Sequence, residues 1–198
     1  YPYKIYCDMD GVLCNFEKAA VKAINIQLKS ENPKKPELAA AIIEELGRDY
    51  ITVEDIQKYS PGKSGAATTY MYHLVHDDVD FWANLEWQPG GKQLWAYIRQ
   101  FEPDILTSPM DKKGHNESLE GKIIWIEKNL GLSPDKVNFA HDKYKYAVSE
   151  DGKPNILIDD FKTKVGPFTD AGGIGILHIS AENTIKLLEL LKQTNETP

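Results

Sequence analysis

The order of hydrophobic and polar positions predicts two kinds of element along this chain. Short apolar runs typical of buried strands occur at residues 3–8, 104–107, 137–140, 155–159 and 173–179. Between them lie longer segments in which apolar residues recur every three or four positions, as in amphipathic helices. Strands that alternate with helices need crossover connections, and these give a parallel sheet. The pattern therefore predicts an α/β fold, a doubly wound parallel sheet of about five strands.

Residues 15–88 interrupt this alternation, because they contain helical patterns and no convincing strand. Asn15 can cap a helix over 16–30, while Pro36 and Gly47 are well placed to begin and to end the next helix. Further helical patterns are expected at 53–59 and 66–76, with a loop at 60–65. The stretch is therefore expected to form a small helical cap inserted after the first strand.

The second half of the chain returns to the α/β pattern. Amphipathic helices are expected at 89–101 and 118–131, with Gly131 as the stop of the second, and Ser180 can cap a helix that ends the chain. A polar, hairpin-like insertion at 144–155 has no assignable role. The expected organisation is a core formed by residues 1–14 and 89–198 and a cap formed by residues 15–88.

Composition narrows the class of protein. A chain of 198 residues with 41% hydrophobic residues can bury one ordinary core plus an insertion. The net charge is −7 and the chain has no basic tract, which argues against binding of long nucleic acid. No apolar run approaches the ~20 residues of a membrane span, so no membrane partner is expected. Cys7 and Cys14 fit neither a redox nor a zinc motif, which favours reduced thiols and a cytoplasmic location.

Side chains that could act as catalysts or ligands follow the first four predicted strands. Ligands bind outside the carboxyl ends of the strands of an open parallel sheet, so these side chains are expected to meet at one edge. Two acidic pairs at that edge should repel each other unless a divalent cation holds them, and hard oxygen ligands favour Mg²⁺. The residues are Asp8 and Asp10, then Thr107 and Ser108, then Lys143, then Asp159 and Asp160.

These segments resemble a known family. DMDGVL, ILTSP, a downstream lysine and ILIDD are similar, in order and placement, to the four motifs of the haloacid dehalogenase (HAD) superfamily of phosphotransferases. The resemblance implies an HAD-like Rossmannoid core and magnesium-dependent phosphoryl transfer. It makes Asp8 the nucleophile that forms an aspartyl-phosphate, and Asp10 the acid–base catalyst whose backbone carbonyl also binds the metal. Thr107, with help from Ser108, would donate to a phosphate oxygen.

Two assignments within this resemblance stay open. Lys143 fits the position of the family lysine best, while Lys122 in a helix and Lys112 or Lys113 in a loop rank lower. The metal ligands implied are Asp8, Asp10, Asp159 and Asp160. Of the last two, the resemblance favours Asp160 as the direct ligand and Asp159 as its supporting neighbour, although the sequence alone does not choose.

Further segments point to a substrate class. DMDGVLCNFE and FWANLEWQPGGKQLW resemble the 5'(3')-deoxyribonucleotidases, and so does the WIEKNLG stretch after the second motif. The likeness implies that Phe16 and Trp82 line a pocket for a nucleobase, because aromatic faces stack on bases. Either ring could instead be a core residue. The segment 33–65 does not align with this family, which leaves the choice of base open.

The sequence therefore predicts a magnesium-dependent phosphomonoesterase that hydrolyses (deoxy)nucleoside monophosphates. Two alternatives remain. The chain could be a related phosphatase that acts on another small phosphorylated metabolite or a polynucleotide end. It could also be a catalytically silent protein that binds phosphate for regulation, although its intact Asp8 and Asp10 count against this. The expected partner is a small phosphate ester, and the oligomeric state is open, a homodimer included.

Overall fold

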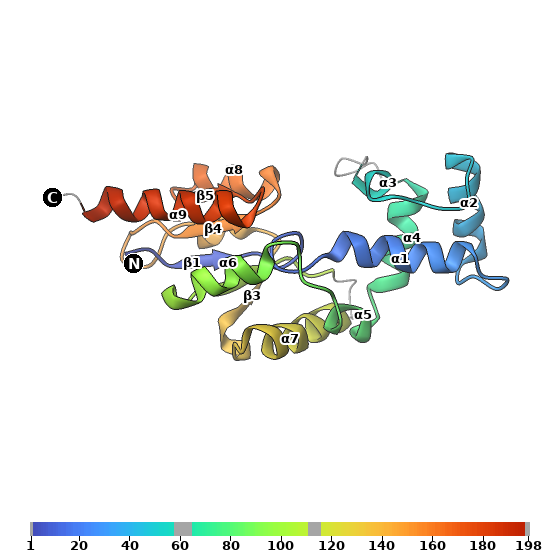
Figure 1. The fold of residues 1–198 in the computed structure, drawn as a ribbon, viewed down its shortest axis with the longest axis horizontal. Helices are drawn as coiled ribbons and strands as arrows, with labels where there is room; N and C mark the ends of the chain where they lie inside the picture. Colours follow the sequence, from blue (N-terminus) through green and yellow to red (C-terminus); the bar gives the residue numbers. More distant parts are fainter. Residues whose placement is uncertain (1, 58–64, 111–115, 197–198) are drawn as a thin grey trace. The chain divides into compact units, whose positions relative to one another are not determined.

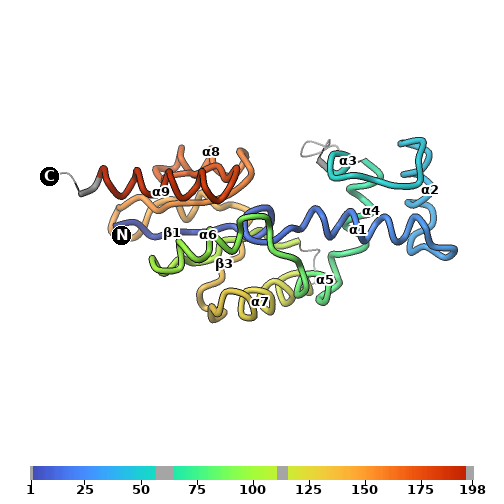
Figure 2. The backbone as a smooth tube through the Cα atoms, viewed as in Figure 1, coloured from blue at the N-terminus to red at the C-terminus, as the bar shows by residue number. Residues whose placement is uncertain are grey.

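The chain folds into two compact units (Figure 1). The structure is a computed structural model that describes residues 2–57, 65–110 and 116–196. The sheet unit consists of Tyr1–Asn15, Glu86–Pro109 and Ile126–Pro198, and the helical unit of Phe16–Leu85 and Met110–Trp125. The chain leaves the sheet unit after Asn15 and returns to it at Glu86, a path that can be followed in Figure 2. The segment 110–125, which the sequence assigns to the core, belongs to the helical unit.

The sheet unit contains five parallel strands in the order β3-β2-β1-β4-β5. This confirms the predicted doubly wound α/β fold. After β1 the chain builds β2 and β3 on one side of it, then crosses back to place β4 and β5 on the other side. The order of the strands therefore reverses beside β1, where ligands bind in folds of this kind. The strands are β1 (Ile5–Cys7), β2 (Asp104–Thr107), β3 (Val137–Phe139), β4 (Ile156–Asp159) and β5 (Ile174–Leu177).

Helices complete the sheet unit. α6 and α9 pack against each other, and α8 packs against β4 and β5. On one face of the sheet, Leu106 of β2 and Leu157 of β4 form a buried cluster with Phe168 of α8, as the alternation of side chains along strands requires. The central strands are thereby held rigidly, and so are the residues that follow them. The helices are α6 (Gly91–Ile98), the 3₁₀-helix η1 (Arg99–Phe101), α8 (Lys162–Asp170) and α9 (Ala181–Glu196).

The connection from β3 to β4 contains no α-helix. It consists of a 3₁₀-helix, η3 (Lys143–Tyr146), and a turn in which Val148 pairs with Pro154. Asn155 anchors the turn, because its side-chain amide donates to Tyr146 O at 2.8 Å and its backbone N–H donates to Ala147 O at 2.8 Å. α8 packs against η3. The insertion that the sequence left unassigned is therefore the crossover itself, tied to the end of η3 by Asn155.

The helical unit is built around α4, which packs against α1, α2 and α3. Pro36 begins α2, and Gly47 ends it with a left-handed φ of 67°, both as the sequence predicts. Asp78 caps the short helix α5 by accepting from Phe81 N at 2.9 Å. The elements are α1 (Phe16–Leu28), α2 (Pro36–Leu46), α3 (Val53–Gln57), α4 (Ala66–Val75), α5 (Val79–Ala83) and α7 (Glu117–Leu130), the last continuing beyond this unit.

Other expectations have mixed outcomes. Cys7 and Cys14 are free and buried, as the sequence predicts. Of the expected loop at 60–65, all but Gly65 lies outside the described residues. In the part of the chain that the structure describes, every helix is too short or too polar to span a bilayer.

A buried ion pair in the helical unit gives a test of this fold. Asp55 is 2% exposed; it accepts from Thr52 N at 2.8 Å and pairs with Arg48 at 2.5 Å. Burial acts to raise the pKa of Asp55, but these contacts outweigh it and lower the pKa below its usual value. Asp55→Ala should lower the free energy of unfolding by about 1–3 kcal/mol, measured by urea denaturation. Asp151→Ala, which removes an exposed pair with Lys153, should have a smaller effect, below about 1 kcal/mol.

Candidate functional site

The site begins with the pairing of β1 and β4. Cys7 and Ile158 lie in register, and the backbone N–H of Asp8 donates to Ile158 O at 2.8 Å. The next residue on each strand is an aspartate, so Asp8 and Asp159 leave the sheet side by side. Asp160 follows directly. The parallel register therefore brings together residues that are about 150 positions apart in the chain.

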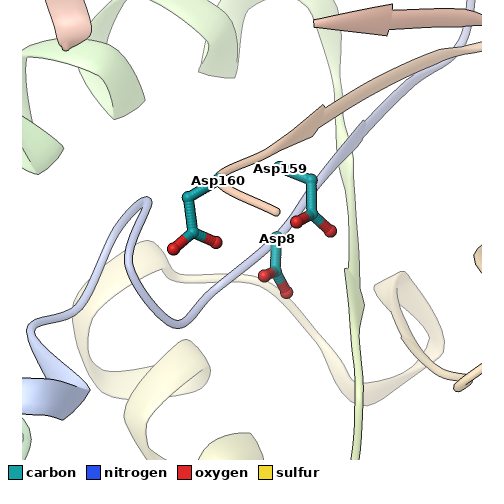
Figure 3. A group of neighbouring side chains, drawn as sticks. All are labelled: Asp8, Asp159 and Asp160. Carbon is teal, nitrogen blue, oxygen red and sulfur yellow. The ribbon is translucent and has the colours of Figure 1, made fainter. Parts of the chain in front are cut away.

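Three carboxyl groups gather at this edge of the sheet (Figure 3). Asp8, Asp159 and Asp160 each offer an oxygen, and these oxygens lie within 4.8 Å of one another. Asp8 is 6% exposed and Asp159 is fully buried. Like charges at this distance and depth repel strongly, so the cluster needs positive charge nearby.

Lys143 supplies part of that charge. Its Nζ lies 2.8 Å from Asp8 Oδ1 and 2.6 Å from Asp159 Oδ2, and the residue is 2% exposed. Lys122, one of the lower-ranked candidates for this lysine, lies in the helical unit, where its Nζ is 4.8 Å from the ring centre of Trp82. Lys112 and Lys113 lie outside the described residues. The position of Lys143 matches the role that the sequence predicts for it, and that role stays a prediction.

The pKa values of these groups reflect the balance between the buried negative charges and the charge of Lys143. Burial, partly offset by Lys143, raises the pKa of Asp8 to about 6. Burial, together with the charges of Asp8 and Asp159, raises the pKa of Asp160 to about 8. Burial alone would lower the pKa of Lys143, but the two aspartates paired with it raise it above its ordinary value. One lysine therefore leaves the acidic cluster short of positive charge.

The two adjacent aspartates have different surroundings. Asp159 uses both oxygens, since Oδ2 contacts Lys143 and Oδ1 accepts from Phe161 N at 2.8 Å. Asp160 Oδ1 is buried and accepts no hydrogen bond from the described residues. An unpartnered carboxylate oxygen beside two further carboxylates is the donor set of a hard divalent cation such as Mg²⁺. The residues present therefore fit a magnesium ion, which Asp8 and Asp160 would hold with their side chains, and this choice of ligands stays a prediction.

Gly11 leaves room for Asp160. Its φ of 76° lies in the left-handed region, and a Cβ there would come within 2.2 Å of Asp160 Oδ2. Any side chain at this position would displace the carboxylate. Sequence reasoning missed this role of Gly11, although the glycine of the DMDGVL motif is a recognisable signal for a tight turn.

The remaining predicted residues of the sheet unit lie around this edge. Thr107 is the last residue of β2, next to β1, and is fully buried. The Ser108 hydroxyl donates to Ala140 O at 3.1 Å, which ties it to the backbone after β3. Asp10 is half-buried in the turn that follows Asp8, and Cys14 Sγ lies 3.2 Å from its Oδ1. Their chemical roles stay predictions.

Phe16 and Trp82 belong to the helical unit. Their rings stack with a centroid distance of 5.1 Å, and Trp82 Nε1 donates to Val75 O at 2.7 Å. Trp82 is 1% exposed, so a base could stack on it only after repacking, whereas Phe16 is half-buried. The structure therefore brings the two predicted base-pocket residues together as packing partners, and their role toward a substrate stays a prediction.

Comparisons with known proteins give matches among solved structures. No protein-family model and no curated protein sequence matches the chain. One similar structure is a putative beta-phosphoglucomutase from Thermotoga maritima (15% identity, TM-score 0.47), which covers 96% of this chain and 99% of that chain. Another is a hydrolase from Streptococcus pneumoniae TIGR4 (14%, 0.49), with 96% and 100% covered. A third is the putative HAD-hydrolase YfnB from Bacillus subtilis bound to magnesium (14%, 0.49), with 94% and 98% covered.

The raised pKa values predict how stability depends on pH when no metal is present. An acid whose pKa is higher in the folded state binds more protons when folded, so stability falls as pH rises through the interval between the two values. For Asp160 this interval runs from 3.8 to about 8. In EDTA, the free energy of unfolding should be roughly 2 kcal/mol lower at pH 8 than at pH 6 because of this group.

Urea denaturation of wild type and Asp160→Asn at both pH values measures this contribution. The side chain at position 160 is uncharged at both pH values in the variant. The free energy of unfolding of the variant should therefore change less between pH 6 and pH 8 than that of wild type. Equal changes in the two proteins would contradict the raised pKa of Asp160.

The close approach of Gly11 to Asp160 predicts loss of metal binding in Gly11→Ala. We expect Mg²⁺ to raise the melting temperature of wild type, and this rise should disappear in the variant because the new methyl group must push the carboxylate away. Gly131→Ala is the matched control, because Gly131 has a similar φ of 67° with no atom near its would-be Cβ. That variant should lose some stability but keep the full response to Mg²⁺. An unchanged response in Gly11→Ala would show that Asp160 is not a ligand.

Proposed function

We propose that this chain is a magnesium-dependent phosphomonoesterase of the HAD type, which hydrolyses (deoxy)nucleoside monophosphates through an aspartyl-phosphate on Asp8. One observation carries the proposal. Asp8, Asp159 and Asp160 come from two strands to within 4.8 Å, and a buried lysine pairs with the first two. The ordered motifs around these residues resemble those of the superfamily, and the resemblance supplies the chemistry that such a cluster would perform.

The first half of the reaction transfers the phosphoryl group to the protein. Asp8 attacks phosphorus, an O–P bond forms on its carboxylate, and the bond from phosphorus to the leaving oxygen breaks. Asp10 gives a proton to that oxygen, so the product leaves as a neutral alcohol. Lys143 remains beside Asp8 and offsets the negative charge that gathers on the transferred group, while Thr107 donates to one of its oxygens.

The second half releases phosphate. Asp10, now a carboxylate, takes a proton from water while the water oxygen attacks phosphorus and the bond to Asp8 breaks. Asp159 keeps Lys143 in place throughout, because Lys143 Nζ donates a hydrogen bond to Asp159 Oδ2 at 2.6 Å. Asp8 and Asp160 would hold Mg²⁺, and its positive charge would let a carboxylate approach a phosphate dianion.

The identity of the leaving alcohol rests on weaker support. The deoxyribonucleotidase-like segments around Phe16 and Trp82 favour a nucleoside. Trp82 is 1% exposed, however, and its indole N–H is already bonded to Val75 O. That observation favours a second candidate function, a phosphatase for another small phosphorylated metabolite that needs no stacking on Trp82.

A phosphate-release assay separates the two candidates. Deoxy- and ribonucleoside 5'- and 3'-monophosphates and a set of sugar phosphates should be tested with Mg²⁺ and with EDTA. We expect phosphate release from mononucleotides with Mg²⁺ and none with EDTA. Release from sugar phosphates only would support the second candidate, and release from neither would overturn the assignment as a phosphatase.

The nucleophile is tested by Asp8→Asn, which should lower kcat by about 10³-fold or more. Acid quenching with labelled substrate should trap a covalently labelled protein in wild type and not in this variant. Asp151→Asn, which changes an exposed aspartate far along the chain, should keep full activity. A trapped label in Asp8→Asn would mean that another residue accepts the phosphoryl group.

A further inference from the structure

Cys14 is buried, and its thiol also contacts the side chain of Asp10. It is fully buried at the end of the turn that carries Asp10, and its Sγ lies 3.2 Å from Asp10 Oδ1. The turn is closed by backbone hydrogen bonds, from Cys14 N to Met9 O at 3.0 Å and from Gly11 N to Cys14 O at 2.9 Å. The backbone thus places the thiol directly against the carboxyl group of the proposed acid–base catalyst.

The segment that precedes α6 holds Cys14 from its other side. Cys14 forms an antiparallel bridge with Trp87, and Gln88 N donates to Leu13 O at 2.8 Å. A Cβ on Gly91 would come within 2.6 Å of Leu13 O, which shows how closely the backbones approach here. All of these residues belong to the sheet unit. Cys14 is therefore fixed between two backbone segments and has little freedom to turn its thiol elsewhere.

The thiol has one proton to donate, and Met9 O and Asp10 Oδ1 are two acceptors near it. Met9 O lies 3.5 Å from Sγ, whereas Asp10 Oδ1 is nearer, at 3.2 Å. The shorter distance favours donation of the S–H to Asp10. A carboxyl group that must first give and then take a proton works only if it keeps one orientation through both steps.

We propose that Cys14 is a positioning residue for Asp10: its S–H holds Asp10 Oδ1 and leaves proton exchange to Oδ2. The inference rests on the proposed function, because it assigns Cys14 a part in the proton transfer that Asp10 performs there. Cys14 acts only through Asp10 and touches no reacting atom. The sequence predicts only a reduced thiol at this position, and the contact with Asp10 gives that thiol a role.

The test compares Cys14→Ala, which removes the donor, with Cys14→Ser, which keeps a donor of similar size. The substrates are phosphate monoesters of increasing leaving-group pKa, from p-nitrophenyl phosphate to an alkyl phosphate, and the readout is kcat/KM. In Cys14→Ala, kcat/KM should fall about tenfold for the alkyl ester, whose leaving oxygen needs the proton, and less than about twofold for p-nitrophenyl phosphate. Cys14→Ser should restore the dependence on leaving-group pKa seen in wild type.

Cys7→Ala is the matched control. Cys7 is also fully buried, but its thiol donates to the backbone carbonyl of Asp8 at 3.3 Å. Any loss in this variant should be the same for every leaving group. Thermal melting should show that all variants are folded at the assay temperature.

The outcomes separate this inference from the proposed function. An equal loss for all leaving groups in Cys14→Ala, or a Cys14→Ser variant that behaves like Cys14→Ala, would overturn the positioning role while wild-type activity still supports the phosphatase. Absence of phosphate release from every ester by wild type would overturn the proposed function, and the role of Cys14 with it.

Discussion

The balance between clustered carboxylates and one buried lysine is the constraint on which the rest of the site depends. Lys143 is paired with Asp8 and Asp159, and each pairing offsets part of the cost of burying those charges. Asp160 receives no such partner among the described residues, and its pKa rises to about 8. A site that is stable but short of one positive group is well suited to take up a cation.

The backbone around the cluster is as constrained as its charges. Gly11 must have no side chain, because Asp160 occupies the space beside it. Cys14 closes the same turn and places its thiol against Asp10. The short turn after β1 thus supports both the proposed metal ligand and the proposed proton donor. The turn begins where the central strand of the sheet ends, so hydrogen-bonded strands on both sides of β1 position its first residue.

Much of the fold follows from local patterns. The apolar runs identify all five strands of the sheet to within one or two residues at most ends, and Pro36 and Gly47 mark the exact bounds of α2. Two helices were not recognised. α5 has five residues, too few for an apolar residue to recur with the helical period, and Pro167 inside α8 argues against a helix because it lacks the N–H that helical hydrogen bonding needs. In both cases tertiary packing outweighs the local signal.

The order of residues is enough to predict which acids, hydroxyls and lysines follow the strands, and that an α/β sheet brings them to one edge. Which of these side chains contact one another follows from the folded chain alone. Lys143 rather than Lys122 meets Asp8, Asp159 rather than Asp160 is occupied by that lysine, and Trp82 is enclosed by its neighbours. Such choices depend on distances of a few ångströms between residues far apart in the chain, and a sequence pattern does not encode those distances.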